Sequence, residues 1–421
     1  MKCKNCKSKS LKKIIFLNKQ PISSVFLKKK KNNLKKYSLD LYECKICNLV
    51  QFKTLPPLDD MYGETYGYRT SLSPLMINHM KSKYKILKKQ FKKKSFILDI
   101  GSNDGTFLNF FASIGFKNLY AIDPSSFKFK KFYNKNVNLI TDYFSKNKVI
   151  KYMKSSQQKF DLITSFAMFY DIENPNNFCK DINELLKNNG VWVLELSYFP
   201  LLLKNLTYDQ ICHEHVTYYT LNTFEKIAKN NNLKIIDYSF NEINGGSIEI
   251  KCSKKNSNLR AKTQKIKQLI KKENIINFNS YNKFNDRIEN TKKVLKLFLS
   301  KIKPRDIIGY GASTKGNIVL NHCEITNKNL SYICDANPYK FNRYTPGSNI
   351  KIISKKEMRI KKPKYLLVLI WSFRSEVIKQ EINYIKNGGK LIFHLPIFHI
   401  IDKDNYKKYL KKNFKSFSFD I

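Results

Sequence analysis

Acidic side chains and arginine are scarce in this sequence of 421 residues. It holds 33 Asp and Glu against 78 Lys and Arg, a formal net charge of +45 at pH 7, and only seven of the basic residues are Arg. Arginine is the residue that forms paired hydrogen bonds with phosphates and guanine edges, whereas these lysines are spread among Asn and Ile from end to end. The charge therefore predicts no nucleic-acid partner, and we interpret most of it as lysine on solvated faces.

Long apolar runs are also absent. No stretch approaches the roughly 20 apolar residues that span a bilayer, and no apolar segment follows the positive charges at the N-terminus. We therefore expect no membrane partner and a cytoplasmic protein. Hydrophobic residues still make up 42% of the chain and aromatic residues 14%, so it can bury sizeable cores. At roughly 150 residues per domain, its length suggests two or three domains.

Cysteine is too sparse for a disulfide scaffold, with nine in the whole chain. Four of them form two C-x2-C pairs, Cys3 with Cys6 and Cys44 with Cys47. Each pair can offer two thiolates from one tight turn, and four thiolates without an open position are typical of a structural zinc site. Between the two pairs we expect a hairpin formed by the apolar stretches 14–17 and 25–27.

Short apolar runs alternate with helical stretches in the rest of the chain, which predicts an α/β protein with parallel sheets covered on both faces. The expected parts are a zinc-binding domain at 1–65, a larger α/β domain at 66–255, an amphipathic helical connector at 256–300 and a smaller α/β domain at 301–421. The strands expected in the larger domain are 95–100, 118–123, 137–140, 160–165, 191–196, 233–240 and 247–252. Those expected in the smaller domain are 306–311, 330–335, 365–371 and 390–395.

The first expected strand of the larger domain runs directly into a loop that contains glycine. Gly101 and Gly105 let the backbone approach a ligand, and the helix that follows offers free N–H groups. The G-x-G-x-x-G spacing of dinucleotide-binding loops is not met. Asp123 ends the second strand, where a carboxylate can accept hydrogen bonds from both hydroxyls of a ribose.

This pattern, Asp-x-Gly-x-x-x-Gly with a later acid closing the second strand, resembles class I S-adenosylmethionine-dependent methyltransferases. The resemblance implies a Rossmann-like fold in which the loop cradles the methionine part of S-adenosylmethionine and the acid holds the ribose. It also implies an acid near the adenine. The cofactor-binding residues implied in this way are Asp99, Gly101, Asn103, Gly105, Asp123 and Asp142.

The densest polar cluster lies at 208–219, where His213 and His215 flank Glu214. Their spacing is not that of the helical His-Glu-x-x-His zinc pattern. An imidazole can accept a proton at neutral pH, and a neighbouring carboxylate can orient the ring and stabilise its charged form. Because the cluster follows the expected strand 191–196 and active-site groups gather at strand ends, we predict a general base here, with either histidine in that role.

Ordered motifs along nearly the whole chain resemble those of nucleotide-sugar C-methyltransferases. They are the four-cysteine module and residues 66–71, 99–105, 211–215, 244–247, 309–317, 346–347 and 371–376. The resemblance implies a zinc-binding N-terminal domain, a central methyltransferase domain and a Rossmann-like C-terminal domain that helps to hold the nucleotide sugar. It further implies methylation at carbon, typically C-3 of a dTDP-4-keto-deoxysugar. O-methylation of a sugar or small molecule and a non-catalytic nucleotide-sugar-binding protein are the alternatives.

By this resemblance His215 would remove the C-3 proton beside Glu214, with Tyr66 as a further catalytic contact and His213 as the alternative base. The substrate-binding residues would be Tyr68, Lys315, Arg343 and Arg374. Lys315 lies in a glycine-bounded turn, where a cation and backbone N–H groups suit a diphosphate, and the two arginines stand out because Arg is rare here.

Two departures from the family pattern bear on the substrate. The segment 165–172 lacks the His that many members carry, and His394 stands where a Pro is expected. The sugar is therefore left open, and no oligomeric state is predicted.

Overall fold

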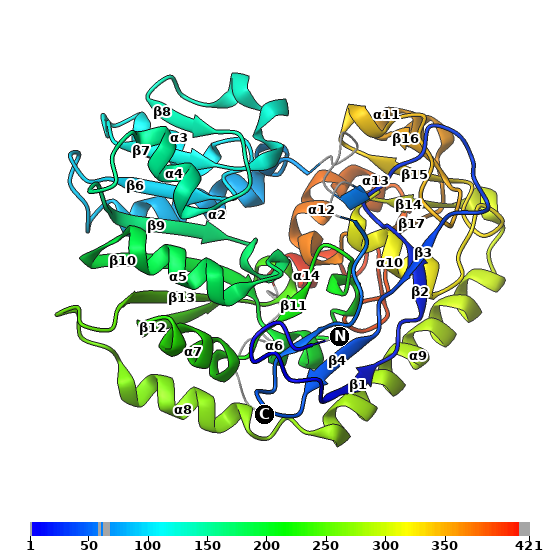
Figure 1. Cartoon of the computed structure of the whole chain (residues 1–421). Helices are drawn as coiled ribbons and strands as arrows, with labels where there is room; N and C mark the ends of the chain where they lie inside the picture. The colour runs from blue at the N-terminus through cyan, green and yellow to red at the C-terminus, as the bar shows by residue number, and fades with distance from the viewer. Residues whose placement is uncertain (1, 58–59, 62–67, 412–421) are drawn as a thin grey trace.

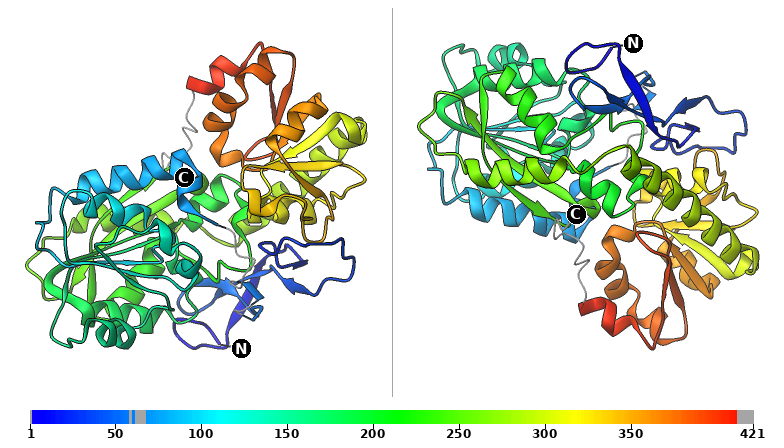
Figure 2. Two further views of the ribbon diagram at one scale, coloured as in Figure 1. Left: turned by 90° about the horizontal axis from the view of Figure 1, so that it is seen from above. Right: turned by 90° about the horizontal axis from the view of Figure 1, so that it is seen from below.

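The computed structural model describes residues 2–57, 60–61 and 68–411. Two α/β lobes lie side by side, the central domain in cyan and green and the C-terminal domain in yellow and orange (Figure 1). The N-terminal segment, in blue, lies along one side of the molecule against both lobes (Figure 2). None of the described helices combines the length and the apolar character needed to cross a membrane.

The central domain is built on a seven-stranded sheet with the order β12-β13-β10-β9-β6-β7-β8. Its strands are β6 (Ile97–Ile100), β7 (Leu119–Ile122), β8 (Val137–Ile140), β9 (Phe160–Phe166), β10 (Leu186–Ser197), β12 (Leu233–Asn241) and β13 (Ser247–Lys254). The pairs from β8 to β10 are parallel, and β13 is antiparallel to both of its neighbours. All seven strands and the closing antiparallel hairpin were predicted, because each strand is a separate apolar run.

Helices cover both faces of this sheet. On one face, α2 (Pro74–Leu87) and α3 (Thr106–Ala112) bury their apolar residues against β6, β7 and β9. On the other, α4 (Lys146–Met153), α5 (Pro175–Leu185) and α7 (Leu221–Asn230) share one core with the sheet. This is the layered arrangement that parallel strands need, because both of their faces are apolar.

The C-terminal domain has a six-stranded sheet with the order β16-β15-β14-β17-β18-β19. Its strands are β14 (Ile307–Tyr310), β15 (Tyr332–Asp335), β16 (Lys351–Ser354), β17 (Tyr365–Val368), β18 (Lys390–Phe393) and β19 (His399–Ile401), with helices α10 (Thr314–His322), α11 (Lys355–Lys361), α12 (Arg374–Gln380), α13 (Ile382–Lys386) and α14 (Tyr406–Lys411). The four expected strands are present. The two edge strands, β16 and β19, were not predicted.

The connector consists of α8 (Thr263–Glu273) and the long α9 (Phe278–Ser300), as its helical periodicity predicts. The first turn of α9 is capped by Asn277, whose side chain accepts hydrogen bonds from two backbone N–H groups. From α9, Asn285 Nδ2 donates to the carbonyl oxygen of Ile14 over 2.9 Å. The connector therefore holds the N-terminal domain as well as joining the two lobes.

The N-terminal strands pair differently from the expected hairpin. Strand β1 (Leu11–Ile15) pairs with β4 (Leu41–Cys44), and β2 (Lys19–Pro21) pairs with β3 (Lys36–Ser38). The stretch 25–27 instead packs on the C-terminal domain, where Leu27 forms a bridge with Tyr344. The hairpin prediction was wrong because the apolar residues at 25–27 bury themselves against another domain rather than against β1.

Candidate active site

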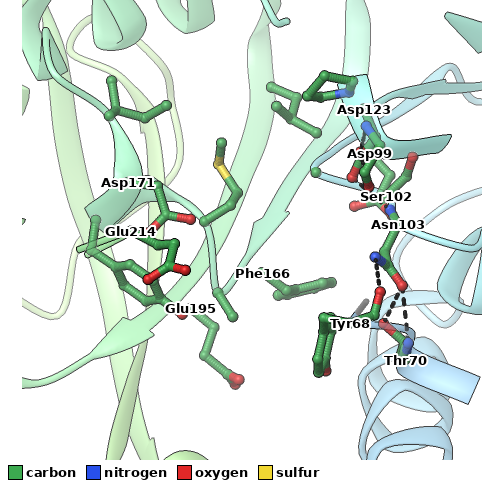
Figure 3. A pocket seen from close by; sticks show the side chains of 18 of the residues that line it. Tyr68, Thr70, Asp99, Ser102, Asn103, Asp123, Phe166, Asp171, Glu195 and Glu214 are labelled. Atoms are coloured by element: carbon green, nitrogen blue, oxygen red, sulfur yellow. Dashed lines mark hydrogen bonds between the residues drawn. The ribbon is translucent and has the colours of Figure 1, made fainter. Parts of the chain in front are cut away.

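A cavity of about 450 Å³ lies at the carboxyl ends of β6, β7, β9 and β10. This is the edge of an open α/β sheet at which ligands bind. Figure 3 shows Asp99, Ser102, Asn103 and Asp123 on one side of the cavity and Asp171 and Glu214 across from them. Thr314 and Lys315 of α10 also line it, so the C-terminal domain contributes to the site.

The glycine loop lies at one end of the cavity. Gly101 and Gly105 have φ angles of 73° and 76°, which only glycine adopts readily, and a Cβ on Gly101 would lie 2.9 Å from Met168 Cγ. Burial raises the pKa of Asp99 to about 7, and Thr164 donates to its carboxylate over 2.6 Å. The loop is thus held in a conformation that brings backbone close to a ligand.

Asp123 closes β7 and lines the cavity, as predicted. Its Oδ2 accepts a hydrogen bond from Asn103 N over 2.9 Å, and its Oδ1 accepts one from Ser125 N over 2.6 Å. Burial raises the pKa of this carboxyl group, and these hydrogen bonds oppose the shift. Ser125 Oγ also donates to Oδ1 over 2.6 Å. The side chain is therefore fixed in place, and among the described contacts one lone pair of Oδ2 is left for a ligand hydroxyl.

Asn103 lines the cavity, but its side chain is engaged with the segment that precedes α2. Its Oδ1 accepts from Thr70 N over 2.9 Å, and its Nδ2 donates to the carbonyl oxygen of Tyr68 over 3.2 Å. These bonds place Tyr68 on the cavity wall beside Phe166 (Figure 3). Tyr66 lies outside the described residues.

The two histidines of the polar cluster have different surroundings. His215 lines the cavity, with its ring centroid 4.2 Å from that of Tyr170. Burial, together with the charge of Lys315, lowers the pKa of His215 to about 3, so its imidazole is neutral at pH 7. His213 is not among the lining residues, and its Nε2 donates to the carbonyl oxygen of Tyr37 over 3.3 Å. Of these two histidines, only His215 therefore lies where it could contact a ligand in the cavity.

Glu214 lines the cavity between the two histidines and is 6% exposed. Burial raises the pKa of its carboxyl group, and neither of its carboxyl oxygens has a hydrogen-bond partner among the described residues. Asp171, on the short turn after β9, faces it in Figure 3. In the sequence, the segment 165–172 that contains Asp171 stands out only for its missing His.

Lys315 reaches the cavity from the first turn of α10. Its Nζ donates to Asn244 Oδ1 over 2.9 Å, which ties the C-terminal domain to the Asn-Gly-Gly turn of the central domain. Burial lowers the pKa of Lys315, and the carboxyl group of Asp209 opposes that shift. Asp209 is in turn held by Trp371, whose Nε1 donates to its Oδ2 over 2.8 Å. A half-buried lysine is thus presented to the cavity by a network that spans both lobes.

Four other predicted residues are not among the lining residues, and they are Gly105, Asp142, Arg343 and Arg374. Asp142 pairs with Lys148 over 2.5 Å, while its neighbours Tyr143 and Phe144 are lining residues. Arg343 donates to the carbonyl oxygens of Tyr339 and Phe26, and the guanidinium of Arg374 lies over the ring of Tyr409.

Glu195 is a lining residue that sequence reasoning missed. His79 donates to it over 2.9 Å, Lys83 pairs with it over 2.6 Å and Asn241 donates to it over 2.7 Å. Although burial opposes ionisation, Lys83 and His79 hold the pKa of Glu195 at about 2. Its position near the carboxyl end of β10 was the available signal, because residues at that end of a parallel strand face the ligand-binding edge.

The four predicted cysteines lie together in the N-terminal domain, with all four sulfur atoms within 4.8 Å of one another. Cys3 and Cys47 approach to 3.5 Å, as do Cys6 and Cys44. A tetrahedral zinc ion with Zn–S bonds of about 2.3 Å places its sulfurs about 3.8 Å apart, so this cluster fits the ion. Each C-x2-C pair is followed by a residue with φ of 62°, Lys7 in one case and Asn48 in the other, which gives the two turns the same shape.

Comparisons with known proteins divide the chain in the same order. Residues 3–62 match the family model "Putative zinc binding domain", residues 76–238 a "Methyltransferase domain" and residues 242–396 a "C-methyltransferase C-terminal domain". The chain is 23% identical over 375 residues to the C-methyltransferase NovU of Streptomyces niveus, an alignment covering 88% of this chain and 89% of NovU.

Similar solved structures cover less than half of the chain. They include magnesium protoporphyrin IX methyltransferase from Synechocystis PCC 6803 with bound SAM, at 12% identity and a TM-score of 0.31, covering 42% of this chain and 79% of that one. Another is protein PH0226 from Pyrococcus horikoshii OT3, at 17% identity and a TM-score of 0.35, covering 44% of this chain and 94% of that one.

Proposed function

We propose that this chain, whose parts match a zinc-binding domain, a methyltransferase domain and a C-methyltransferase C-terminal domain, transfers a methyl group from S-adenosylmethionine to a carbon of a nucleotide-linked keto-deoxysugar. The observation that carries this proposal is the shared cavity. His215 and Asp123 of the central domain and Lys315 of the C-terminal domain all line it. A proton acceptor, a cation for an anionic ligand and a ribose-binding acid are thereby brought together.

The residues around the glycine loop fit the methyl donor. S-adenosylmethionine, when bound, supplies a methyl group on a positively charged sulfur. Asp123 would accept hydrogen bonds from its ribose hydroxyls, and the loop from Asp99 to Gly105 would hold its methionine part. We assign the adenine to the wall formed by Tyr143 and Phe144, which line the cavity next to the predicted residue Asp142.

His215 is the residue we assign as the general base. A 4-keto group acidifies the C–H bond on the adjacent carbon, so a positioned imidazole can remove the C-3 proton. Its depressed pKa keeps the ring unprotonated at neutral pH but also makes it a weaker base, so the proton that it accepts has to be stabilised by a neighbouring group. Glu214, directly before it, can stabilise the imidazolium that forms. The nucleophile is then the enolate carbon, held in a cavity that limits access of water.

Lys315 is the residue we assign to the diphosphate of the nucleotide sugar. It is the only lysine or arginine among the lining residues that the structure describes. Arg343 and Arg374, which the sequence also suggested, are bound elsewhere and would have to meet the ligand beyond the cavity wall. The dTDP-linked sugar remains our proposed substrate, and Tyr68 a proposed contact for it.

The test is exchange of the C-3 proton with deuterated solvent in the absence of S-adenosylmethionine. The wild-type chain should catalyse this exchange on the accepted keto-sugar, His215→Ala should not, and His213→Asn should retain it. Retention by His215→Ala and loss by His213→Asn would assign the base to His213. Screening dTDP-, GDP- and CDP-linked keto-sugars by mass spectrometry for the gain of one CH2 identifies the substrate, and methylation without C-3 exchange would indicate transfer to oxygen.

A further inference from the structure

The loop that carries His215 ends in a strand that belongs to the N-terminal domain. This strand, β11 (Thr217–Tyr218), is the fourth strand of the cysteine-domain sheet, whose order is β1-β4-β5-β11. It pairs antiparallel with β5 (Val50–Phe52), and Phe52 N donates to the carbonyl oxygen of Val216 over 3.1 Å. The backbone immediately after the proposed base is therefore held by the N-terminal domain. The strand that holds it, β5, begins three residues after Cys47.

Gln51 joins the cysteine cluster to this strand. Its backbone pairs with Thr217, two residues after His215. Its side chain is fully buried, and its Oε1 accepts a hydrogen bond from Lys4 N over 2.8 Å. Lys4 follows Cys3 directly, inside the first C-x2-C turn. One residue thus contacts the metal-binding turn through its side chain and the catalytic segment through its backbone.

A second set of contacts links the position of β11 to the imidazole of His215. The hydroxyl of Thr217 donates to the carbonyl oxygen of Tyr170 over 3.2 Å. The ring of Tyr170 in turn packs against that of His215, with 4.2 Å between centroids. The register of β11 on β5 therefore sets both the backbone that leads to His215 and the aromatic ring beside its imidazole.

We propose that Gln51 is a positioning residue of the methyl-transfer reaction. Through its hydrogen bond to the first C-x2-C turn, Gln51 holds β11 and so keeps His215 directed into the cavity. This inference rests on the proposed function, because it takes His215 as the base. It gives the zinc-binding domain a role in catalysis besides stability. The glycine loop and Asp123 follow β6 and β7 of the central sheet, so binding of S-adenosylmethionine should not depend on Gln51.

The experiment compares Gln51→Met with Gln20→Met, two full-length variants that lose the same amide. Gln20 is 3% exposed in β2 of the same domain, where its backbone pairs with Tyr37. Among the described contacts, its side chain bonds only to the carbonyl of Leu17 and to no residue of β5 or β11. Loss of one buried hydrogen bond in Gln51→Met should speed amide exchange of residues 216–218 and lower kcat, each roughly tenfold. Zinc content and the KM for S-adenosylmethionine should stay at wild-type values, and Gln51→Glu, which keeps an oxygen acceptor, should restore the exchange rate.

Unchanged exchange at 216–218 in Gln51→Met would overturn the link, and an equal loss of kcat in Gln20→Met would show general destabilisation instead. Two results together would refute the proposed function but support the link between Gln51 and β11. They are fast amide exchange at 216–218 in Gln51→Met, and no exchange of the C-3 proton of the sugar by the wild-type chain. If Gln51→Met does not fold, removing zinc from the wild-type chain with a chelator gives the same comparison. Exchange at 216–218 must then accelerate before exchange in β6 and β7, and the reverse order would overturn the proposal.

Discussion

Replacing Lys315 with Met should separate substrate binding from cofactor binding. Met preserves an unbranched side chain but removes the ammonium group. Of the three N–H donors on that group, Asn244 takes one among the described residues, which leaves two for a diphosphate. Loss of a hydrogen bond to a charged group costs about 1.5–3 kcal/mol, so binding of the nucleotide sugar should weaken about 10- to 150-fold.

The same substitution should change the pH dependence in a defined direction. Burial and, to a smaller extent, the charge of Lys315 together lower the pKa of His215 to about 3. Without that charge the pKa of His215 must rise, so the acid limb of kcat/KM, which reports the free enzyme, should move to higher pH. At a pH on the acid limb, the variant should therefore keep a smaller share of its pH 7 activity than the wild-type chain does.

The assay is a pair of titrations by calorimetry, one with each ligand, and a pH profile of initial rates. Binding of S-adenosylmethionine should stay unchanged, because Asp123 and the glycine loop belong to the other domain. Lys340→Met is the matched control, since Lys340 also lies in the C-terminal domain and its Nζ donates to the carbonyl oxygen of Ala312, outside the cavity lining. Wild-type affinity for the nucleotide sugar in Lys315→Met, or an acid limb that stays in place or moves to lower pH, would refute the reasoning.

Three further variants test other parts of the molecule. Cys44→Ser should lower zinc from about one ion per chain towards none in metal analysis, and full zinc occupancy would show that this cysteine is not a ligand. Asp123→Ala should weaken binding of S-adenosylmethionine about 10- to 150-fold in calorimetry while leaving the nucleotide sugar bound; an equal loss of both would point to a damaged fold. His394 is fully buried, and burial lowers its pKa to about 3, so the unfolded chain gains a proton below pH 6.5 that the native chain does not. Stability should therefore fall by about 2 kcal/mol between pH 6.5 and 5 on this account, and His394→Leu should reduce that fall in urea titrations, whereas an unchanged pH slope would contradict it.

The sequence predicts the central sheet well because each of its strands is a distinct apolar run. All four residues of β6 are buried, for example, and the positive φ angles of Gly101 and Gly105 explain why glycine stands there. The edge strands β16 and β19 have four and three residues and are only partly buried, so they carry no comparable signal. Strand β11 has only two residues, and its pairing partner lies in another domain. Local pattern cannot reveal a contact made across domains.

The choice between His213 and His215 shows the same limit at the level of one side chain. Side chains two residues apart point to the same side only in regular extended backbone. Here His215 N donates a hydrogen bond to the carbonyl oxygen of Cys212, so the backbone turns between the two histidines. His213 consequently meets Tyr37 of the N-terminal domain, and His215 meets the cavity. Which histidine faces the cavity is thus set by packing between domains, and the sequence left both open for that reason.

The distribution of charge around the cavity explains how so basic a chain can act on one small anionic ligand. Six carboxyl groups line the cavity, from Asp99, Asp123, Asp171, Glu173, Glu195 and Glu214. In a chain with 78 Lys and Arg, Lys315 is the one such residue among the described lining positions. A general excess of lysine would attract anions over the whole surface, whereas a single half-buried cation among carboxylates would bind the proposed nucleotide sugar only where its diphosphate can reach. The net charge of +45 is therefore a poor guide to the substrate, whereas the position of Lys315 in the cavity favours the proposed anionic one.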